Sequence, residues 1–524
     1  MEIFENRLMS FGYLTKNGLF KILSFLILLF FLLINGYFYQ NKALALHFVD
    51  EEYNFVLGRQ IIEGRKLYSE AFLNHQPLAP ILSVPIQKIT KPNSIFLLVK
   101  HHREAMIVYG ILWLIFLYFR FGLAVLVFAP IFETTKVYLM GNLFLAESLA
   151  IYPLVYIAVI SFKKLKEISK LESILIGICL SVIFFLILPL WPLIFGISIF
   201  LIIQKKITRQ NILYVIIGTL PLIVLFFLTS SFKEYIDQTI FYNFRYIPFD
   251  SNEPLLVRTI KSFVTPLISI FTPAETPSGK IIQLLSLILS SNLVWLLWKK
   301  KYSLVILIII LLGLANLRFI QPTHVFYRGF HLLPWFALLV LFTVLTSIDS
   351  IKTAKSFLVK TILIYLLGAT VLLSLSWGRE FLFVKNDMQR DWYVNYSNQF
   401  TIGEAIKIMK NEQKESGETL FVIPDEWLIY WQSGFKLPVK INTYYPWMDK
   451  IPKLKNNFET MFLASPPTFL YCDCPKDLPI RLYLVNYDQL IKNGQNSSLF
   501  VLKSKLEDLS KDQIDKLKYY GFEI

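Results

Sequence analysis

Long uninterrupted apolar runs constrain this chain more than any other feature of its sequence. The first extends from Leu19 to Tyr39, and a helix needs about 20 apolar residues to cross the roughly 30 Å hydrocarbon core of a bilayer. Comparable runs recur as far as residue 375, and only 17% of all residues are charged, against about 25% in soluble domains. The sequence therefore predicts an all-α polytopic membrane protein.

The positive charges predict how the spans are oriented. After the first span, further spans are predicted over residues 105–118, 121–132, 143–160, 173–188, 194–203, 212–228, 281–298, 304–317, 332–345 and 357–375. Basic clusters follow alternate spans, at residues 163–166, 205–209, 299–301 and 352–360. Lys and Arg accumulate in cytoplasmic loops, so about eleven spans are expected, with the N-terminus in the cytoplasm and the C-terminus outside the cell membrane. This bias also explains the net charge of +15 without nucleic acid as a partner.

Two domains are predicted. Residues 1–377 form the membrane domain, which includes a long first outer loop at 40–104, and residues 378–524 form a soluble extracytoplasmic α/β domain. In the second domain, strand-like apolar runs and charged helical stretches alternate. The expected strands are 419–423, 468–472 and 482–485, and the expected helices are 403–415 and 506–519.

The first outer loop carries three adjacent carboxylates, Asp50, Glu51 and Glu52. Burial and mutual repulsion raise the pKa of a carboxylate, whereas a nearby cation lowers it. Such a group is a candidate for a general base or for a cation ligand. The alternative is a solvated acidic loop without a chemical role.

The residues after these acids predict an amphipathic helix on the membrane surface. Apolar side chains recur at helical spacing over residues 53–62, and Arg59 is expected to point toward lipid head groups. Gly64 is expected to end this helix, and Pro77 to begin the next one.

This loop resembles the first external loop of GT-C glycosyltransferases, especially the family 39 group related to protein mannosyltransferases and lipid A aminoarabinose transferases. The matching elements are Asp50-Glu51, Tyr53, Gly64-Arg65-Lys66-Leu67-Tyr68 and His75-Gln76-Pro77-Leu78. Gln76 departs from the pattern, because the family often has Pro there.

The resemblance implies a sugar donor on polyprenyl phosphate and a lipid, glycan or protein acceptor outside the cytoplasm. The implied reaction inverts the anomeric carbon. Asp50 is the expected general base and Glu51 the alternate, while Glu52 is expected to face away. The substrate-binding residues expected in this loop are Tyr53, Arg59, Arg65, Tyr68 and His75.

A departing phosphate needs cations, and Arg suits it best because of its forked donors. Besides Arg59 and Arg65, the stretch before the span at 332–345 supplies Arg328 and His331. These two are three residues apart and would share a helix face. Interfacial snorkelling is the alternative explanation for Arg328.

Glu147 lies inside an apolar run, where an ionisable group is costly and indicates function. It resembles the acid that GT-C enzymes place at the second external loop, and we include it among the substrate-binding residues. Glu133 competes for that role. Either acid could instead pair with Lys136 as part of the structure.

Other classes of protein are less compatible with the sequence. It contains no Walker loop, no GxSxG and no HExxH motif. Cys472 and Cys474 lack two further ligands at recognisable spacing, so they are expected to form a free or oxidised pair. No cofactor is expected, and residues 50–52 alone do not support a metal. A surface-polysaccharide polymerase or ligase, a transporter and an inactive scaffold are the alternatives to a glycosyltransferase.

Overall fold

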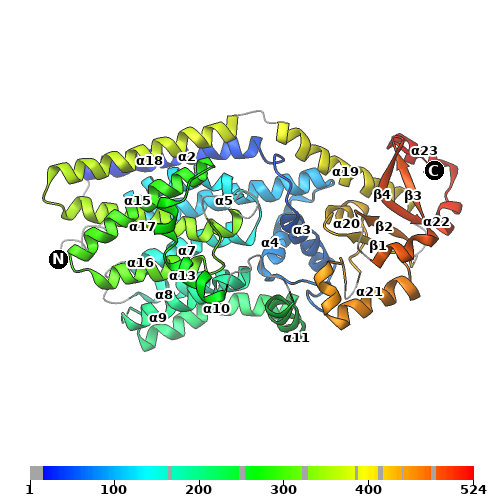
Figure 1. Ribbon diagram of the computed structural model, residues 1–524, viewed down its shortest axis with the longest axis horizontal. Helices are drawn as coiled ribbons and strands as arrows, with labels where there is room; N and C mark the ends of the chain where they lie inside the picture. The colour runs from blue at the N-terminus through cyan, green and yellow to red at the C-terminus, as the bar shows by residue number, and fades with distance from the viewer. Residues whose placement is uncertain are drawn as a thin grey trace. The chain divides into compact units, whose positions relative to one another are not determined.

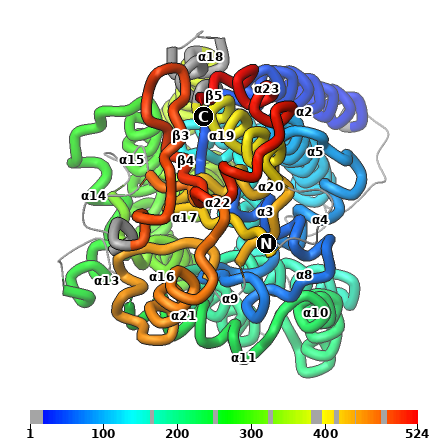
Figure 2. Tube along the Cα trace, turned by 90° about the vertical axis from the view of Figure 1, so that its right-hand side faces the viewer, coloured from blue at the N-terminus to red at the C-terminus, as the bar shows by residue number. Residues whose placement is uncertain are grey.

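The computed structural model describes residues 16–162, 168–204, 206–246, 254–321, 329–383, 387–410, 417–438, 441–473 and 479–523 (Figures 1 and 2). Its contacts divide the chain into two compact units. The helical unit comprises residues 1–42, 103–224 and 251–385, and the mixed unit comprises residues 43–102, 225–250 and 386–524. The predicted domain boundary at residue 377 stays a prediction. The contacts group the first outer loop with the C-terminal region.

The helical unit contains the apolar runs that the sequence predicts to be spans, except the last residues of the run at 212–228. Its longer helices are α2 (Lys16–Asn41), α5 (Ile95–Phe121), α6 (Leu123–Thr135), α7 (Ala146–Phe162), α8 (Lys170–Leu186), α9 (Trp191–Ile203), α10 (Arg209–Thr229), α13 (Leu255–Phe263), α15 (Pro277–Trp298), α16 (Tyr302–Ala315), α17 (Leu333–Thr353) and α18 (Phe357–Phe383). Shorter elements are η1 (Lys136–Leu139), η2 (Leu188–Leu190), α14 (Thr265–Phe271) and η4 (Gly329–Leu332). The first residues of α5 and the last of α10 belong to the mixed unit.

Six helices in the described part of the chain are long and apolar enough to cross a membrane. They cover Gly18–Asn41, Ile95–Phe121, Arg209–Thr229, Pro277–Trp298, Gly329–Thr353 and Phe357–Arg379. Three shorter apolar helices cover Ala146–Phe162, Leu188–Ile203 and Tyr302–Ala315. The expected multi-pass membrane protein is thus confirmed. The number of about eleven crossings and their orientation stay predictions.

The helical unit is held together by the close packing of apolar helices. Helix α17 is buried along most of its length and contacts α6, α7 and α15, while α2 and α18 run alongside each other (Figure 1). Helices α8 and α10 meet at Gly177 and Gly218. A Cβ built on either glycine would lie 2.1–2.2 Å from a carbonyl oxygen of the facing helix. Glycine at this crossing therefore permits a backbone approach that no larger residue would allow.

The mixed unit contains a five-stranded sheet of order β1-β2-β4-β3-β5 (orange to red in Figure 2). Its strands are β1 (Leu420–Ile423), β2 (Phe469–Cys472), β3 (Tyr487–Lys492), β4 (Gln495–Leu502) and β5 (Phe522–Glu523). Strands β1 and β2 are parallel, and the other pairs are antiparallel. The predicted strands at 419–423 and 468–472 are thus confirmed.

Helices from three parts of the chain join this sheet in the mixed unit. They are α3 (Val49–Ile62), α4 (Leu78–Thr90), α11 (Phe232–Tyr235), the π-helix η3 (Ile236–Phe241), α12 (Tyr242–Arg245), α19 (Asp387–Met409), α20 (Leu428–Ser433), η5 (Pro446–Lys450), α21 (Pro452–Ala464), η6 (Pro479–Asn486), α22 (Lys503–Glu507) and α23 (Lys511–Tyr519). Phe72 of the first outer loop lies in one apolar cluster with Phe421 of β1 and Leu470 of β2. The first loop and the C-terminal sheet therefore share a core.

Two expected elements of the C-terminal region differ from the structure. Residues 482–485 lie in η6, and the neighbouring strand begins only at Tyr487. Pro479 begins η6; its fixed φ and missing N–H suit the first turn of a helix. The expected helix at 506–519 is two helices, because Ser510 begins α23 with a capping box that Gln513 completes.

The expected amphipathic surface helix at 53–62 is also different. Gly64 (φ +84°) follows α3 and Pro77 precedes α4, as predicted. However, residues 51–58 of α3 are buried in succession on all sides of the helix. Helices α4 and α20 contact α3, so α3 is a core helix of the mixed unit.

Candidate functional site

The three predicted acids lie in the first turn of α3, where the helix dipole favours negative charge. Asp50 is partly exposed, whereas Glu51 and Glu52 are 1% and 0% exposed. Glu52 turns into the protein, and its Oε1 lies 2.7 Å from Nε2 of His47. The three neighbouring carboxylates thus occupy different environments, and Asp50 is the one that solvent reaches.

Two further acids, which the sequence did not single out, belong to the same cluster. Asp425 and Glu426 follow β1 directly, after the cis peptide between Ile423 and Pro424. The carboxyl ends of parallel strands commonly carry functional groups. An acidic pair directly after the buried run at 420–423 was therefore the signal that could have identified them.

The two added acids have raised pKa values. Burial raises the pKa of Asp425, and the charges of Asp50 and Glu52 raise it further. The hydroxyl of Tyr445, which donates a hydrogen bond to Asp425, acts in the opposite direction. Burial, with Glu52 as the strongest charged neighbour, raises the pKa of Glu426 to about 7. The cluster can therefore hold or release a proton near neutral pH.

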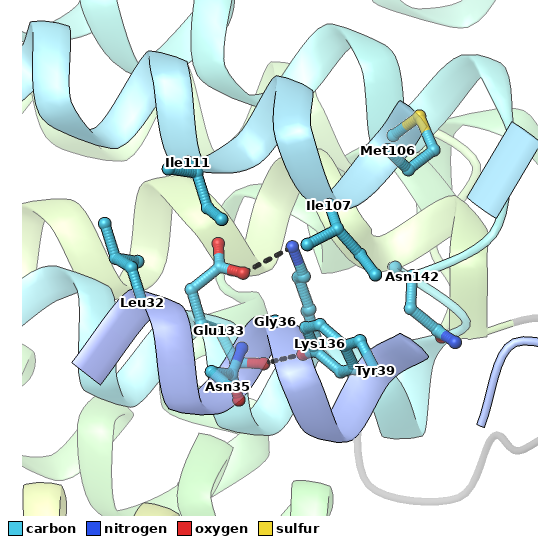
Figure 3. Close-up of a pocket in the computed structure, with 11 residues that line it drawn as sticks. Leu32, Asn35, Gly36, Tyr39, Met106, Ile107, Ile111, Glu133, Lys136 and Asn142 are labelled. Carbon is cyan, nitrogen blue, oxygen red and sulfur yellow. Dashed lines mark hydrogen bonds and ion pairs between the residues drawn. The ribbon is translucent and has the colours of Figure 1, made fainter. Parts of the chain in front are cut away.

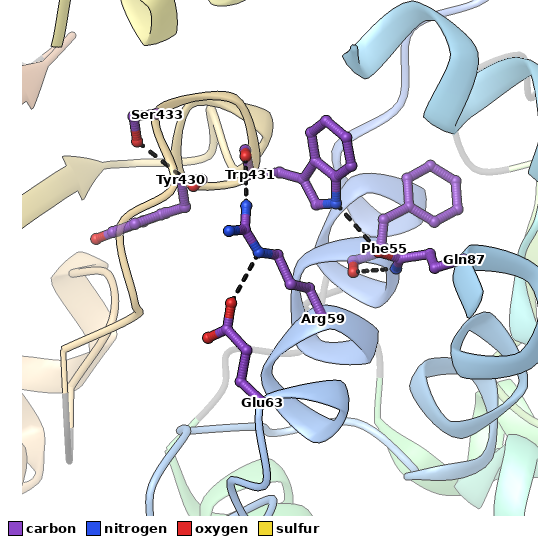
Figure 4. A network of polar contacts seen from close by, with 7 residues as sticks. All are labelled: Phe55, Arg59, Glu63, Gln87, Tyr430, Trp431 and Ser433. Atoms are coloured by element: carbon purple, nitrogen blue, oxygen red, sulfur yellow. Dashed lines mark hydrogen bonds and ion pairs between the residues drawn. The ribbon is translucent and has the colours of Figure 1, made fainter. Parts of the chain in front are cut away.

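Arg59 and Arg65 bind backbone carbonyls of the C-terminal region. In Arg59, Nη1 donates to the carbonyl of Trp431 at 2.6 Å and Nε to Glu63 at 2.9 Å (Figure 4). Arg65 Nη1 donates to the carbonyl of Leu437 at 2.5 Å. These contacts orient Arg59 toward the segment at 431–437 within the mixed unit, and its expected orientation toward head groups stays a prediction.

The aromatic residues of the predicted motif lie around the loop at 72–75. The buried Tyr53 donates to the carbonyl of Phe72, and the buried Tyr68 donates to that of His75 at 2.9 Å. Tyr68 has a φ of +72°, a left-handed conformation that is uncommon for a tyrosine. The side chain of His75 is exposed. Substrate contact by these three residues stays a prediction.

Glu133 and Lys136, considered as a pair in the sequence, do pair in the helical unit. Their side chains are 2.6 Å apart and buried, and they line a small cavity with Asn35, Tyr39 and Asn142 (Figure 3). Tyr39 donates to the backbone carbonyl of Glu133. In a buried ion pair of this kind, the attraction between the two charges offsets part of the cost of removing them from water.

Glu147 and His331, predicted separately, lie together in the helical unit. Nδ1 of His331 is 2.8 Å from Oε1 of Glu147, although the two residues are 184 positions apart. Arg318 lines the same small pocket. Arg328 lies outside the described residues. Of the two acids considered for this region, Glu147 therefore has His331 as its partner, whereas Glu133 has Lys136.

The cysteines are partly described. Cys179 is free and buried in α8, and Cys472 at the end of β2 is disulfide-bonded. Cys474 lies outside the described residues. Of the two expected states, the oxidised one thus applies to Cys472.

Comparison with known proteins identifies the fold. No protein-family model and no curated protein matches the sequence. Among solved structures, the crystal structure of ArnT from Cupriavidus metallidurans bound to undecaprenyl phosphate matches with a TM-score of 0.55 and 9% sequence identity. The match covers 90% of this chain and 97% of that one. The chain therefore has the fold of ArnT.

Proposed function

We propose that this protein transfers a sugar from a polyprenyl-phosphate donor to an acceptor outside the cytoplasm. The carboxylate cluster at the start of α3, in a chain with the fold of ArnT, is the observation that carries the proposal. The undecaprenyl phosphate bound to ArnT supports the class of donor. The acceptor is a lipid, a glycan or a protein that offers a hydroxyl or amine.

Asp50 is our proposed general base. It is the partly exposed member of the trio, whereas the alternate base Glu51 is buried. In the proposed step, the acceptor oxygen or nitrogen forms a bond to the anomeric carbon from the face opposite the phosphate. The bond between that carbon and the phosphate oxygen breaks, and polyprenyl phosphate leaves with the electron pair. Asp50 takes the proton of the acceptor, so the sugar is inverted and all charges are accounted for.

We propose two groups of supporting residues. His75 is exposed on the loop after α3, and Glu147 with His331 forms a polar pair, so these three side chains are proposed to contact substrate, as is Arg328. The second group, Tyr53, Arg59, Arg65 and Tyr68, donates to backbone carbonyls. These four are proposed to fix the shape of the substrate-binding loop.

The test is an assay of the purified full-length protein with a panel of polyprenyl-phosphate sugars and an extract of cell-envelope acceptors. We expect release of free polyprenyl phosphate that depends on both the sugar and the acceptor. The same panel with sugar nucleotides is the matched control and should give no transfer. Transfer from a sugar nucleotide, or no release with any polyprenyl donor by protein that is folded, would contradict the proposal.

A further inference from the structure

Three side chains from two segments of the mixed unit bring potential metal ligands together. They are His47 before α3, Glu52 in its first turn, and Glu426 after β1. One ligand atom from each lies within 4.8 Å of the others. Metal–ligand bonds of about 2.0–2.2 Å place neighbouring ligand atoms roughly 3–4 Å apart. Small side-chain rotations would therefore bring the three atoms to one ion.

A fourth side chain, Gln399 of α19, points at the same place. It is 1% exposed, and its Nε2 lies 2.8 Å from Nε2 of His47 and 3.3 Å from Oε2 of Glu52. Its Oε1 is buried and has no hydrogen-bond partner among the described residues. The two ends of an amide differ little in shape, so a rotation by half a turn directs the oxygen at the cluster.

Glu426 also has a buried oxygen without a hydrogen-bond partner. This atom is its Oε2, and no residue within the described ranges donates to it. His47 and Glu52 contact each other, but no described residue donates a hydrogen bond to Oε1 of Gln399 or to Oε2 of Glu426. Buried oxygens of this kind require a donor or a cation. A cation at the centre would serve both.

We propose that His47, Glu52 and Glu426 bind a divalent transition-metal ion, with the amide oxygen of Gln399 as a fourth donor. One imidazole nitrogen with three oxygens suits Mn²⁺ or Zn²⁺, whereas Ca²⁺ takes six to eight oxygens and no nitrogen. The ion would offset the charges that gather there, because Asp425 and Asp473 also act on Glu426. This site goes beyond the proposed sugar transfer, and its test needs no transfer assay.

The experiment is a titration of the full-length protein with Mn²⁺ after the protein has been stripped with a chelator. Free Mn²⁺ is followed by electron paramagnetic resonance, and Zn²⁺ is added afterwards as a competitor. We expect one ion per chain, displacement by Zn²⁺ and a higher melting temperature with the ion. Glu426→Gln and His47→Gln should each weaken binding at least about tenfold, whereas Glu459→Gln on the exposed face of α21 should bind as the wild type does.

Glu426 is the primary variant because its side chain is partly exposed. Gln399→Met is the second variant, since it retains the volume of the side chain and removes the oxygen donor. It should weaken Mn²⁺ binding and leave the unfolding temperature of the stripped protein nearly unchanged. Absence of stoichiometric binding by the wild type would overturn the proposal, as would equal affinity of wild type, Glu426→Gln and His47→Gln.

Discussion

At the scale of single residues, burial separates the roles of chemically similar acids. Asp50, Glu51 and Glu52 are consecutive, yet only Asp50 is partly exposed, and Glu52 is held by His47. A base that takes a proton from an acceptor must be reachable by it, whereas a buried carboxylate needs a fixed partner. We therefore assign different roles to Asp50 and Glu52 although they are two residues apart.

The first prediction concerns Asp50. Asp50→Asn retains size and hydrogen bonding but cannot take the proton of the acceptor, so transfer should fall by about 10²-fold or more. Donor binding and the melting temperature should change little, because the side chain is partly exposed. Polyprenyl phosphate release is the measurement, and Asp515→Asn, an exposed position on α23, is the matched control. Full activity of Asp50→Asn with an inactive Glu51→Gln would assign the base to Glu51.

The second prediction concerns the pH dependence of stability, measured in the presence of a chelator. Glu426 has a pKa of about 7 in the folded protein and about 4.3 when unfolded. Between these values the folded state binds more protons, so its stability falls as the pH increases from about 4.5 to 7, by roughly 3 kcal/mol at most. Glu426→Gln does not ionise, and its melting temperature should fall less over that range. An unchanged pH profile in this variant, with Glu459→Gln as control, would contradict the raised pKa.

At the scale of elements, local signals predicted the helices well and the strands in part. Each apolar run predicted as a span overlaps a helix along most of its length, because length and hydrophobicity largely decide such segments. The hairpin between β3 and β4 was missed, although Asn493-Gly494 is a strong turn signal and both residues have positive φ. The burial of helix α3 could not be predicted from its own sequence. Its local pattern predicts one face toward the membrane and one toward water, but α4 and α20 contact the helix instead.

The third prediction concerns the crossing of α8 and α10. A Cβ at Gly218 would lie 2.2 Å from the carbonyl oxygen of Ile174, which is backbone and cannot move aside. Gly218→Ala should therefore destabilise the protein by about 1–3 kcal/mol. Gly368→Ala in α18 is the control: nothing lies within 4 Å of the added carbon, so helix propensity alone should make it neutral or slightly stabilising. Thermal unfolding in detergent is the measurement, and equal melting temperatures would contradict the close approach.

At the scale of the whole molecule, local sequence patterns select candidate residues but do not reveal which residues they contact. Glu147 and His331 were both predicted, but nothing in the local sequence relates positions 184 apart. Asp425 and Glu426 were missed: the apolar run at 420–423 that precedes them was a usable signal, but only the fold shows that they lie near Asp50 and Glu52. Tertiary packing decides which residues that are distant in sequence come into contact, and these contacts assemble the site.

The last prediction concerns the orientation of the helical unit. Nζ of Lys206 donates to the carbonyls of Ile160 and Ser161 at the end of α7, at 3.2 and 2.6 Å. Lys206 therefore lies at the end of α7, and in the sequence the cluster at 163–166 follows that end. Lys301 likewise binds Asp349 at 2.5 Å, which joins the cluster at 299–301 to the end of α17.

These contacts pair the cluster at 163–166 with that at 205–209, and the cluster at 299–301 with that at 352–360. The two clusters of each pair must lie on the same side of the membrane. The positive-inside rule assigns that side to the cytoplasm. Reporter fusions after Lys164, Lys206, Lys301 and Lys355 should therefore all report the cytoplasm. If the fusions after Lys164 and Lys206 report opposite sides, the contact of Lys206 with α7 is contradicted. If all four report the exterior, the packing stands and the predicted orientation is reversed, which would place the N-terminus outside.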